Sequence, residues 1–334
     1  MSRPRSAAVV GALLSAALLL PTSGSTARAA AATSERPTAT TATTAVVSTA
    51  QRVDVRRTRP LYADPTSAAA RAAKRDKRFR PLATAPQAKW LLDSHGTGVG
   101  KVARDYVAAA TQAGRTPIVA LYAIPARDCG SHSSGGLTPR QYRAWVRRVA
   151  TPLRGARAIA IVEPDAVAML DACAGQGPRP ALLRYAVDRL RSAGAWVYLD
   201  GGHSSWISPA TMAERLKRSG IANARGFITN VANFQRTADE DAYARAVRAE
   251  LAALGVRKVR YAIETARNGA GPSVEGVCNP RSARVGQRPR IRLTGARDGY
   301  LWVKRPGESD GECGRGDPPA GQWWPRAALR LLGR

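Results

Sequence analysis

Acidic residues are scarce in this chain, and basic residues outnumber them. Among 334 residues there are 24 Asp and Glu against 52 Lys and Arg, which gives a formal net charge of +28. Such a balance is typical of nucleic-acid-binding proteins, because Lys and Arg neutralise phosphates. However, only seven of the basic residues are Lys, a skew towards Arg that a GC-rich genome also produces, and no nucleic-acid recognition motif accompanies the charge. A solvated basic surface is therefore favoured over a nucleic-acid groove, and we expect no nucleic-acid partner.

Long hydrophobic runs are missing after residue 20, which excludes an internal membrane span. The one long apolar run, residues 6–20, follows two arginines and precedes the small-residue site Ala27-Arg28-Ala29. This order is typical of a secretory signal peptide, here residues 1–29, although a retained membrane anchor is an alternative. We expect a secreted, extracellular protein that has no membrane contact once the signal is cleaved.

Cysteine is rare, and no two cysteines form a C-x-x-C pair. This spacing argues against a zinc site, and we expect no metal. An even number of cysteines in an exported chain indicates two disulfides, but spacing alone does not decide their connectivity. The four residues are Cys129, Cys173, Cys278 and Cys313.

The composition changes once along the mature chain. Residues 30–60 are rich in Ala and Thr and show no hydrophobic periodicity, which is typical of a linker or a processed pro-stretch. From Leu61 onward the composition is even, so we expect one domain over residues 61–334. With 44% hydrophobic residues the chain can bury a large core, which excludes wholesale disorder.

Short apolar runs recur in this domain, and segments of helical periodicity such as 142–149 and 181–192 separate them. The clearest runs are residues 117–122, 158–162, 196–199, 226–228, 259–263 and 299–303. Continuous apolar strands that alternate with amphipathic helices are typical of βα units and a parallel sheet. With weaker runs around Leu61 and Trp90, the sequence predicts an α/β fold, a closed (β/α) barrel of seven or eight parallel strands.

The few acids stand where strands are predicted to end. Asp128, Asp165 and Asp200 each follow an apolar run, at spacings of 37 and 35 residues, and Glu308 and Asp310 follow the last run. In a parallel barrel these positions converge on one mouth, where active sites are built. One such Asp could simply cap a helix. Recurrence across separate units favours a carboxylate-lined cleft.

Phosphate-binding motifs are also absent: there is no G-x-x-x-x-G-K-[ST] or G-x-G-x-x-G. Converging carboxylates without a nucleophile indicate general acid/base hydrolysis. Glycoside hydrolysis uses such a pair, with one acid protonating the leaving oxygen and one carboxylate assisting water. Seven Trp also suit sugar stacking.

Five motifs around these residues resemble glycoside hydrolase family 6, the inverting cellulases, and follow in the family's order. The resemblance covers residues 61–332 and implies a single catalytic domain with a distorted barrel, a β-1,4-glucan substrate and no cofactor. The motifs are YAIPARDCG (122–130), VEPD (162–165), LDGGHSSW (199–206), NVANF (230–234) and LWVKRPGESD (301–310).

The resemblance also implies catalytic roles. Asp165 corresponds to the general acid, and Asp128 to an auxiliary aspartate whose charge keeps that acid protonated. Asp310 corresponds to the candidate base, although water can instead be activated indirectly. The resemblance further implies the disulfides Cys129–Cys173 and Cys278–Cys313.

Substrate-binding positions follow in the same way. Tyr122 would crowd the distorted sugar, Ser134 would supply a loop hydroxyl, and Asp200 would be a further site carboxylate or a purely structural one. Trp302 we assign to the core. Sugar-stacking rings and hydroxyl-binding groups are expected at Trp90, Trp206, His203, Asn233, Lys304 and Glu308.

Two positions depart from the family pattern. Val277 stands where the family usually has Trp, and Glu264 where it commonly has Asp, which puts one structural carboxylate in doubt. The intervals from Asp200 to Asn230 and between the last two cysteines are short, 30 and 35 residues, and leave little material to roof the cleft. We therefore expect a monomeric endo-β-1,4-glucanase. An exo-acting cellobiohydrolase and a catalytically silent glycan-binding protein are the alternatives.

Overall fold

The computed structural model describes residues 54–334; the expected signal peptide and most of the Ala/Thr-rich stretch lie outside the described residues. Eight strands form one curved sheet in the order β1-β2-β3-β4-β5-β6-β8-β7, and every neighbouring pair is parallel except β7 with β8. The strands are β1 (Lys89–Leu92), β2 (Ile118–Tyr122), β3 (Ile159–Val162), β4 (Trp196–Asp200), β5 (Gly226–Thr229), β6 (Arg260–Glu264), β7 (Arg290–Thr294) and β8 (Arg297–Leu301).

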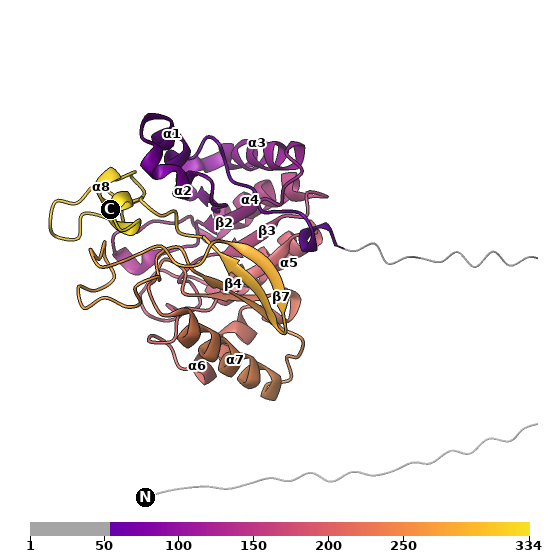
Figure 1. Cartoon of the computed structure of the whole chain (residues 1–334). Coiled ribbons are helices and arrows are strands. Elements are labelled where there is room, and N and C mark those ends of the chain that lie inside the picture. Colours follow the sequence, from indigo (N-terminus) through magenta and orange to yellow (C-terminus); the bar gives the residue numbers. More distant parts are fainter. Residues whose placement is uncertain (1–53) are drawn as a thin grey trace, which may run out of the picture. The chain divides into compact units, whose positions relative to one another are not determined.

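Helices cover the outer face of the sheet (Figure 1). Side-chain oxygens of Ser67, Thr138 and Ser208 cap the first turns of α1, α4 and α6, which satisfies main-chain N–H groups that have no partner within the helix. The helices are α1 (Ala68–Arg75), α2 (Arg80–Ala83), α3 (Val99–Gln112), α4 (Pro139–Ala150), α5 (Arg179–Ser192), α6 (Pro209–Arg218), α7 (Thr237–Ala253) and α8 (Pro325–Leu331).

The core has two layers because both faces of the sheet are buried. In β2 every residue is buried: Ile118 and Ala120 pack inside the curve of the sheet, whereas Val119 and Leu121 pack against the outer helices. This explains why the strands read as continuous apolar runs, since a strand covered on both faces needs no polar alternation. The predicted distorted (β/α) barrel is confirmed.

The sheet does not close in the way that the sequence predicts. Within residues 54–334 no strand ladder joins β1 to β7 or β8; the main-chain N–H of Ala88 donates to Trp302 O (2.9 Å) at that position instead. Strand β8 already pairs with β6 on one side and β7 on the other, so none of its edge is left for β1. The expected strand at Leu61 is a single bridge to Thr116.

Strand β7 was not predicted from the sequence, although its burial alternates along residues 290–294. Strict alternation is the pattern of a half-exposed antiparallel strand, whereas the other strands were recognised from unbroken apolar runs. A tight turn through Gly295, with φ of 56°, returns the chain into β8.

The ordered chain begins before Leu61, with a short 3-10 helix, η1 (Val55–Arg57). Arg56 is 4% exposed, and its guanidinium lies 4.5 Å from the ring centroid of Trp196 at the start of β4. It also donates to the carbonyl of Gly194 (2.9 Å) and pairs with Asp54. Residues 54–57, part of the predicted linker, are thus packed on the domain.

In the described part of the chain, every helix is too short or too polar to cross a membrane.

Candidate active site

A cleft of about 710 Å³ lies at the carboxyl ends of the parallel strands. Its walls come from β1 and from the segments that follow β2, β3, β4, β5, β6 and β8, as expected for a barrel whose site lies at this end. One residue predicted for the site, Asp200, does not line this cleft. Its side chain is buried, with 1% of its surface exposed. The predicted residues that do line it are Trp90, Tyr122, Asp128, Ser134, Asp165, His203, Trp206, Asn233, Lys304, Glu308 and Asp310.

Asp165 stands on a strained turn directly after β3. Glu163 and Asp165 have φ values of 50° and 68°, in the left-handed region that non-glycine residues seldom adopt. The main-chain N–H of Asp165 donates to Asp200 Oδ2 (2.6 Å), which fixes the turn. Burial, and then the charge of Asp128, raise the pKa of Asp165 to about 7.

Asp200 is the last residue of β4 and lies directly behind this turn. Burial, followed by the charge of Asp165, raises the pKa of Asp200 well above its ordinary value. Its position favours the structural reading of Asp200: it holds the main chain of Asp165 rather than facing the cleft.

Asp128 is held by the loop that follows β2. Its Oδ2 accepts from the main-chain N–H (2.8 Å) and the hydroxyl (3.0 Å) of Ser133. The disulfide Cys129–Cys173, which the family resemblance implies, ties this loop to the segment after β3 that carries Asp165. Ser134 lines the cleft, but it is Ser133 that contacts Asp128 and approaches the Tyr122 hydroxyl (3.3 Å).

Asp310 lies among cations. One carboxylate oxygen pairs with Lys304 Nζ (2.8 Å), and the other pairs with Arg267 (2.7 Å) and accepts from the N–H of Asn279 (3.0 Å). Burial opposes its ionisation, but the charges of Arg267 and Lys304 outweigh burial and hold the pKa of Asp310 well below its ordinary range. Asp310 is therefore held as a carboxylate at neutral pH.

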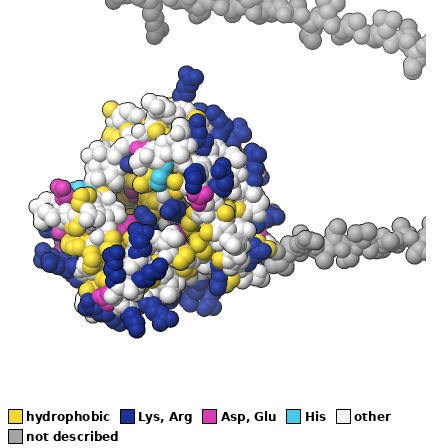
Figure 2. All heavy atoms as spheres, turned by 90° about the horizontal axis from the view of Figure 1, so that it is seen from above, with side chains coloured by type: hydrophobic (Ala, Val, Ile, Leu, Met, Phe, Trp, Pro, Cys, Tyr) yellow, Lys and Arg dark blue, Asp and Glu magenta, His cyan; other side chains and the backbone are white. Residues whose placement is uncertain are grey.

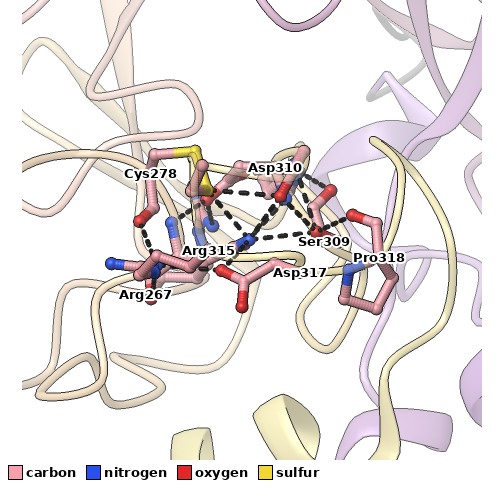
Figure 3. Close-up of a disulfide and its surroundings, with 11 residues drawn as sticks. Arg267, Cys278, Ser309, Asp310, Arg315, Asp317 and Pro318 are labelled. Atoms are coloured by element: carbon pink, nitrogen blue, oxygen red, sulfur yellow. Dashed lines mark hydrogen bonds and ion pairs between the residues drawn. A yellow bond between two sulfur atoms is a disulfide. The ribbon is translucent and has the colours of Figure 1, made fainter.

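The second predicted disulfide, Cys278–Cys313, supports Asp310 (Figure 3). Asn279, next to Cys278, accepts from the N–H of Asp310 (2.7 Å) and donates to Ser309 Oγ (3.0 Å) and Gly311 O (2.8 Å). Both predicted pairings are thus confirmed, and each cross-link joins two loops of the cleft.

Aromatic rings stand along the cleft. Trp90 donates its indole N–H to Val303 O (2.7 Å) and meets Tyr122 edge to face at 5.1 Å. Trp206, which is 38% exposed, lies beside His203 with ring centroids 5.6 Å apart. Burial lowers the pKa of His203 to about 4, so the ring is neutral at pH 7. These rings offer faces on which sugars can stack.

The remaining predicted groups are polar and anchored. Glu308 pairs with Arg305 (2.9 Å), and burial raises its pKa against the opposing charges of Arg305 and Lys304. Asn233 lies in the loop after β5 and uses its side-chain oxygen to accept from the N–H of Phe234 (3.1 Å). Trp302 is buried and donates its indole N–H to Gln287 O, which confirms its assignment to the core.

Two further buried acids organise the site. Glu163, which the sequence analysis did not single out, accepts from the N–H groups of Ala123 (2.9 Å) and Ile124 (3.0 Å). Glu264 accepts from the N–H groups of Val303 (3.0 Å), Lys304 and Ala232, so the structural carboxylate left in doubt is supplied by Glu. Burial raises the pKa of each to about 7.

Sequence reasoning also missed Arg127 and Arg267. Arg127 lies over the Tyr122 ring at 4.6 Å and pairs with Asp93 (2.6 Å). Neither arginine stood out, because 45 arginines in one chain conceal the few that are buried. Val277, the other departure from the family pattern, lines the cleft and is 62% exposed. Among residues 54–334 no His, Cys, Asp and Glu side chains are grouped to hold a metal ion.

Comparison with known proteins agrees with this architecture. Residues 42–334 match the model of the glycosyl hydrolases family 6. The chain is 43% identical to endoglucanase A of Cellulomonas fimi over 278 residues, which are 81% of this chain and 60% of that protein. It is 37% identical to endoglucanase 1 of Streptomyces halstedii over 289 residues, 82% of this chain and 89% of that protein.

A solved structure of the endoglucanase Cel6 from Mycobacterium tuberculosis, in complex with a methyl-cellobiosyl thio-cellobioside, superposes with a TM-score of 0.79 at 41% identity. The match covers 84% of this chain and 98% of that one. A family match over nearly all of the described residues, together with bacterial relatives at these identities, shows that the chain belongs to the glycosyl hydrolases family 6.

Proposed function

We propose that the protein is a secreted, inverting endo-β-1,4-glucanase with Asp165 as its general acid. The observation that carries this proposal is the environment of Asp165, a cleft-lining carboxyl whose pKa is raised to about 7 by burial and by Asp128. A general acid must hold its proton at the working pH and release it to the leaving oxygen, and a pKa near 7 serves both needs.

In this mechanism Asp128 and Asp310 act mainly through charge. The negative charge of Asp128 raises the proton affinity of Asp165. Asp310 is fully ionised and salt-bridged, so it is a weak proton acceptor, and its fixed charge stabilises the positive charge that develops on the sugar ring. We infer that the attacking water passes its proton through a second water to bulk solvent, because Asp310 is too weak a base to keep it.

The substrate proposal rests on the rings and on relatives. Trp90 and Trp206 line the same cleft as Asp165, and their rings offer faces on which glucosyl units can stack. The similar Mycobacterium tuberculosis enzyme was solved with a cellobioside-type ligand, and the bacterial relatives at 37–43% identity are named endoglucanases. The matched length is only 60% of the Cellulomonas fimi protein, so substrate and activity are proposed for this chain on its own cleft.

Internal cleavage is proposed over exo action. A fungal relative described as a probable exoglucanase is 31% identical, and one described as a probable cellobiohydrolase is 28% identical, below the bacterial endoglucanases. The segments between β4 and α6 and between β5 and α7 are short, which leaves the Trp206 side of the cleft exposed. Secretion is proposed from the N-terminal pattern, and the monomeric state stays a prediction.

Replacing Asp165 by Asn should reduce hydrolysis of barley β-glucan by about 10²- to 10⁴-fold, because the leaving oxygen is no longer protonated. With 2,4-dinitrophenyl β-cellobioside, whose leaving group needs no proton, the loss should be less than about tenfold. Asp310→Asn is the matched control and should lose activity on both substrates. Equal losses of Asp165→Asn on the two substrates, with unchanged circular dichroism, would refute the acid assignment.

The dependence of kcat/KM on pH should also show that Asp165 acts as the acid. Asp165 works protonated, so kcat/KM should fall as pH rises through about 7. Asp128→Asn removes the negative charge that raises the pKa of Asp165 and should move this midpoint to lower pH by about one unit. Asp105→Asn, on the exposed face of α3, should leave the midpoint unchanged. An unmoved midpoint in Asp128→Asn would contradict the electrostatic role of Asp128.

Endo action is tested with carboxymethylcellulose. The viscosity of the solution should drop before an appreciable number of reducing ends appears, because internal cuts shorten the polymer quickly. A slow drop in viscosity, with cellobiose as the sole early product, would establish the exo alternative. A folded protein that binds β-glucan without any hydrolysis would establish the silent alternative.

A further inference from the structure

A second cavity, of about 630 Å³, lies away from the cleft. Its walls are η1 with the residues that follow it, the segments that lead into β1 and β2, and the beginning of β7. The cleft is lined instead by residues of β1, the end of β2 and segments that follow the strands, and the two cavities share no lining residue. A ligand in the second cavity would therefore leave the cleft free. Its volume is within the range of about 300–1,000 Å³ that small-ligand sites occupy.

The cavity is lined by arginines and by no acid. Arg57, Arg59, Arg115 and Arg290 are exposed side chains of this lining, and none of them forms an ion pair within residues 54–334. The fifth arginine, Arg56, is already paired with Asp54. Figure 2 shows how Lys and Arg outnumber Asp and Glu on the face it draws. We name the cavity with these four exposed side chains the arginine pocket.

Hydrogen bonds between the segments fix the geometry of the arginine pocket. The N–H of Thr116 donates to Pro60 O, and the N–H of Tyr62 donates to Thr116 O, both at 2.9 Å. These bonds hold the segment of Arg59 beside that of Arg115. Arg290 begins β7 and donates to Gln287 Oε1 (3.0 Å). Four like charges are thus held around one cavity by the fold, at an electrostatic cost that a bound anion would relieve.

The lining of the pocket also contains apolar residues. A uronic acid presents C–H groups on the faces of its ring and a carboxylate at the edge, so it suits a cavity lined by both apolar groups and cations. The guanidinium fork matches a carboxylate with two parallel hydrogen bonds. The apolar lining residues are Pro60, Leu61, Pro65, Pro86, Pro289 and Ile291.

A nucleic acid fits this lining less well. Single-stranded nucleic acid is usually held by aromatic rings on which bases stack. The one aromatic lining residue, Tyr62, is 6% exposed and packs edge to face on Tyr106 at 5.4 Å, so its ring face is covered. We propose that the arginine pocket binds a carboxylate-bearing polysaccharide, a polyuronate. The enzyme would thereby be retained on acidic wall material while the cleft acts on neutral β-glucan.

The test measures retention on polygalacturonate by affinity electrophoresis of the full mature chain, in gels with and without the polymer. The triple variant Arg59→Gln, Arg115→Gln, Arg290→Gln removes three of the four exposed charges of the pocket. Its dissociation constant for polygalacturonate should rise by at least about tenfold, since each lost charged contact weakens binding several-fold. Hydrolysis of neutral barley β-glucan should stay unchanged, which separates this proposal from the proposed function.

The control removes the same charge elsewhere. The variant Arg104→Gln, Arg140→Gln, Arg257→Gln changes three exposed arginines outside the pocket and should weaken retention less than twofold. Equal losses in both triple variants would show that the net charge alone holds the polymer and would overturn the pocket. Tighter retention by duplex DNA or polyphosphate than by polygalacturonate, at the same salt concentration, would overturn the assignment to a polyuronate.

Discussion

At the carboxyl ends of three strands, a buried carboxylate accepts hydrogen bonds from the main chain of the loop next to it. Glu163 after β3 holds the loop after β2, Asp200 of β4 holds the turn at Asp165, and Glu264 of β6 holds the loops after β5 and β8. These are the loops that carry Asp128, Asp165, Asn233 and Asp310. Because the strands end at one level, each carboxylate needs only to reach its neighbour, and the cleft is assembled from short contacts.

The same burial sets the electrostatics of the site. Asp165 and Asp310 line one cleft, yet burial and Asp128 raise the pKa of the first, whereas Arg267 and Lys304 lower that of the second. Two residues of the same type thus differ in protonation because their environments differ: Asp165 can act as an acid, and Asp310 remains an anion. The arrangement has a cost in stability. Glu163, Glu264 and Asp165 bind protons more tightly in the folded chain than in the unfolded one, so the stability that these three groups contribute falls as pH rises from about 4 to about 7.

The features that could be predicted from the sequence are those that leave a pattern among residues close together in the chain. Unbroken apolar runs identified six strands of the sheet, and acids placed just after them located the cleft. The antiparallel β7 was missed because its alternating pattern differs from that of a strand buried on both faces. Arg127 and Arg267 could not be recognised, since which arginine of 45 meets an aspartate depends on loops that approach only in three dimensions. The arginine pocket likewise joins residues 57, 115 and 290, which no spacing relates.

The central claim is that the fold keeps a proton on Asp165 and none on Asp310. Carbon-13 NMR of the protein labelled at its aspartate carboxyl groups measures this directly, with the two signals assigned from the spectra of Asp165→Asn and Asp310→Asn. The account predicts a titration midpoint near pH 7 for Asp165 and no titration of Asp310 in the folded protein. A midpoint near the ordinary aspartate value of about 4 for Asp165 would contradict it.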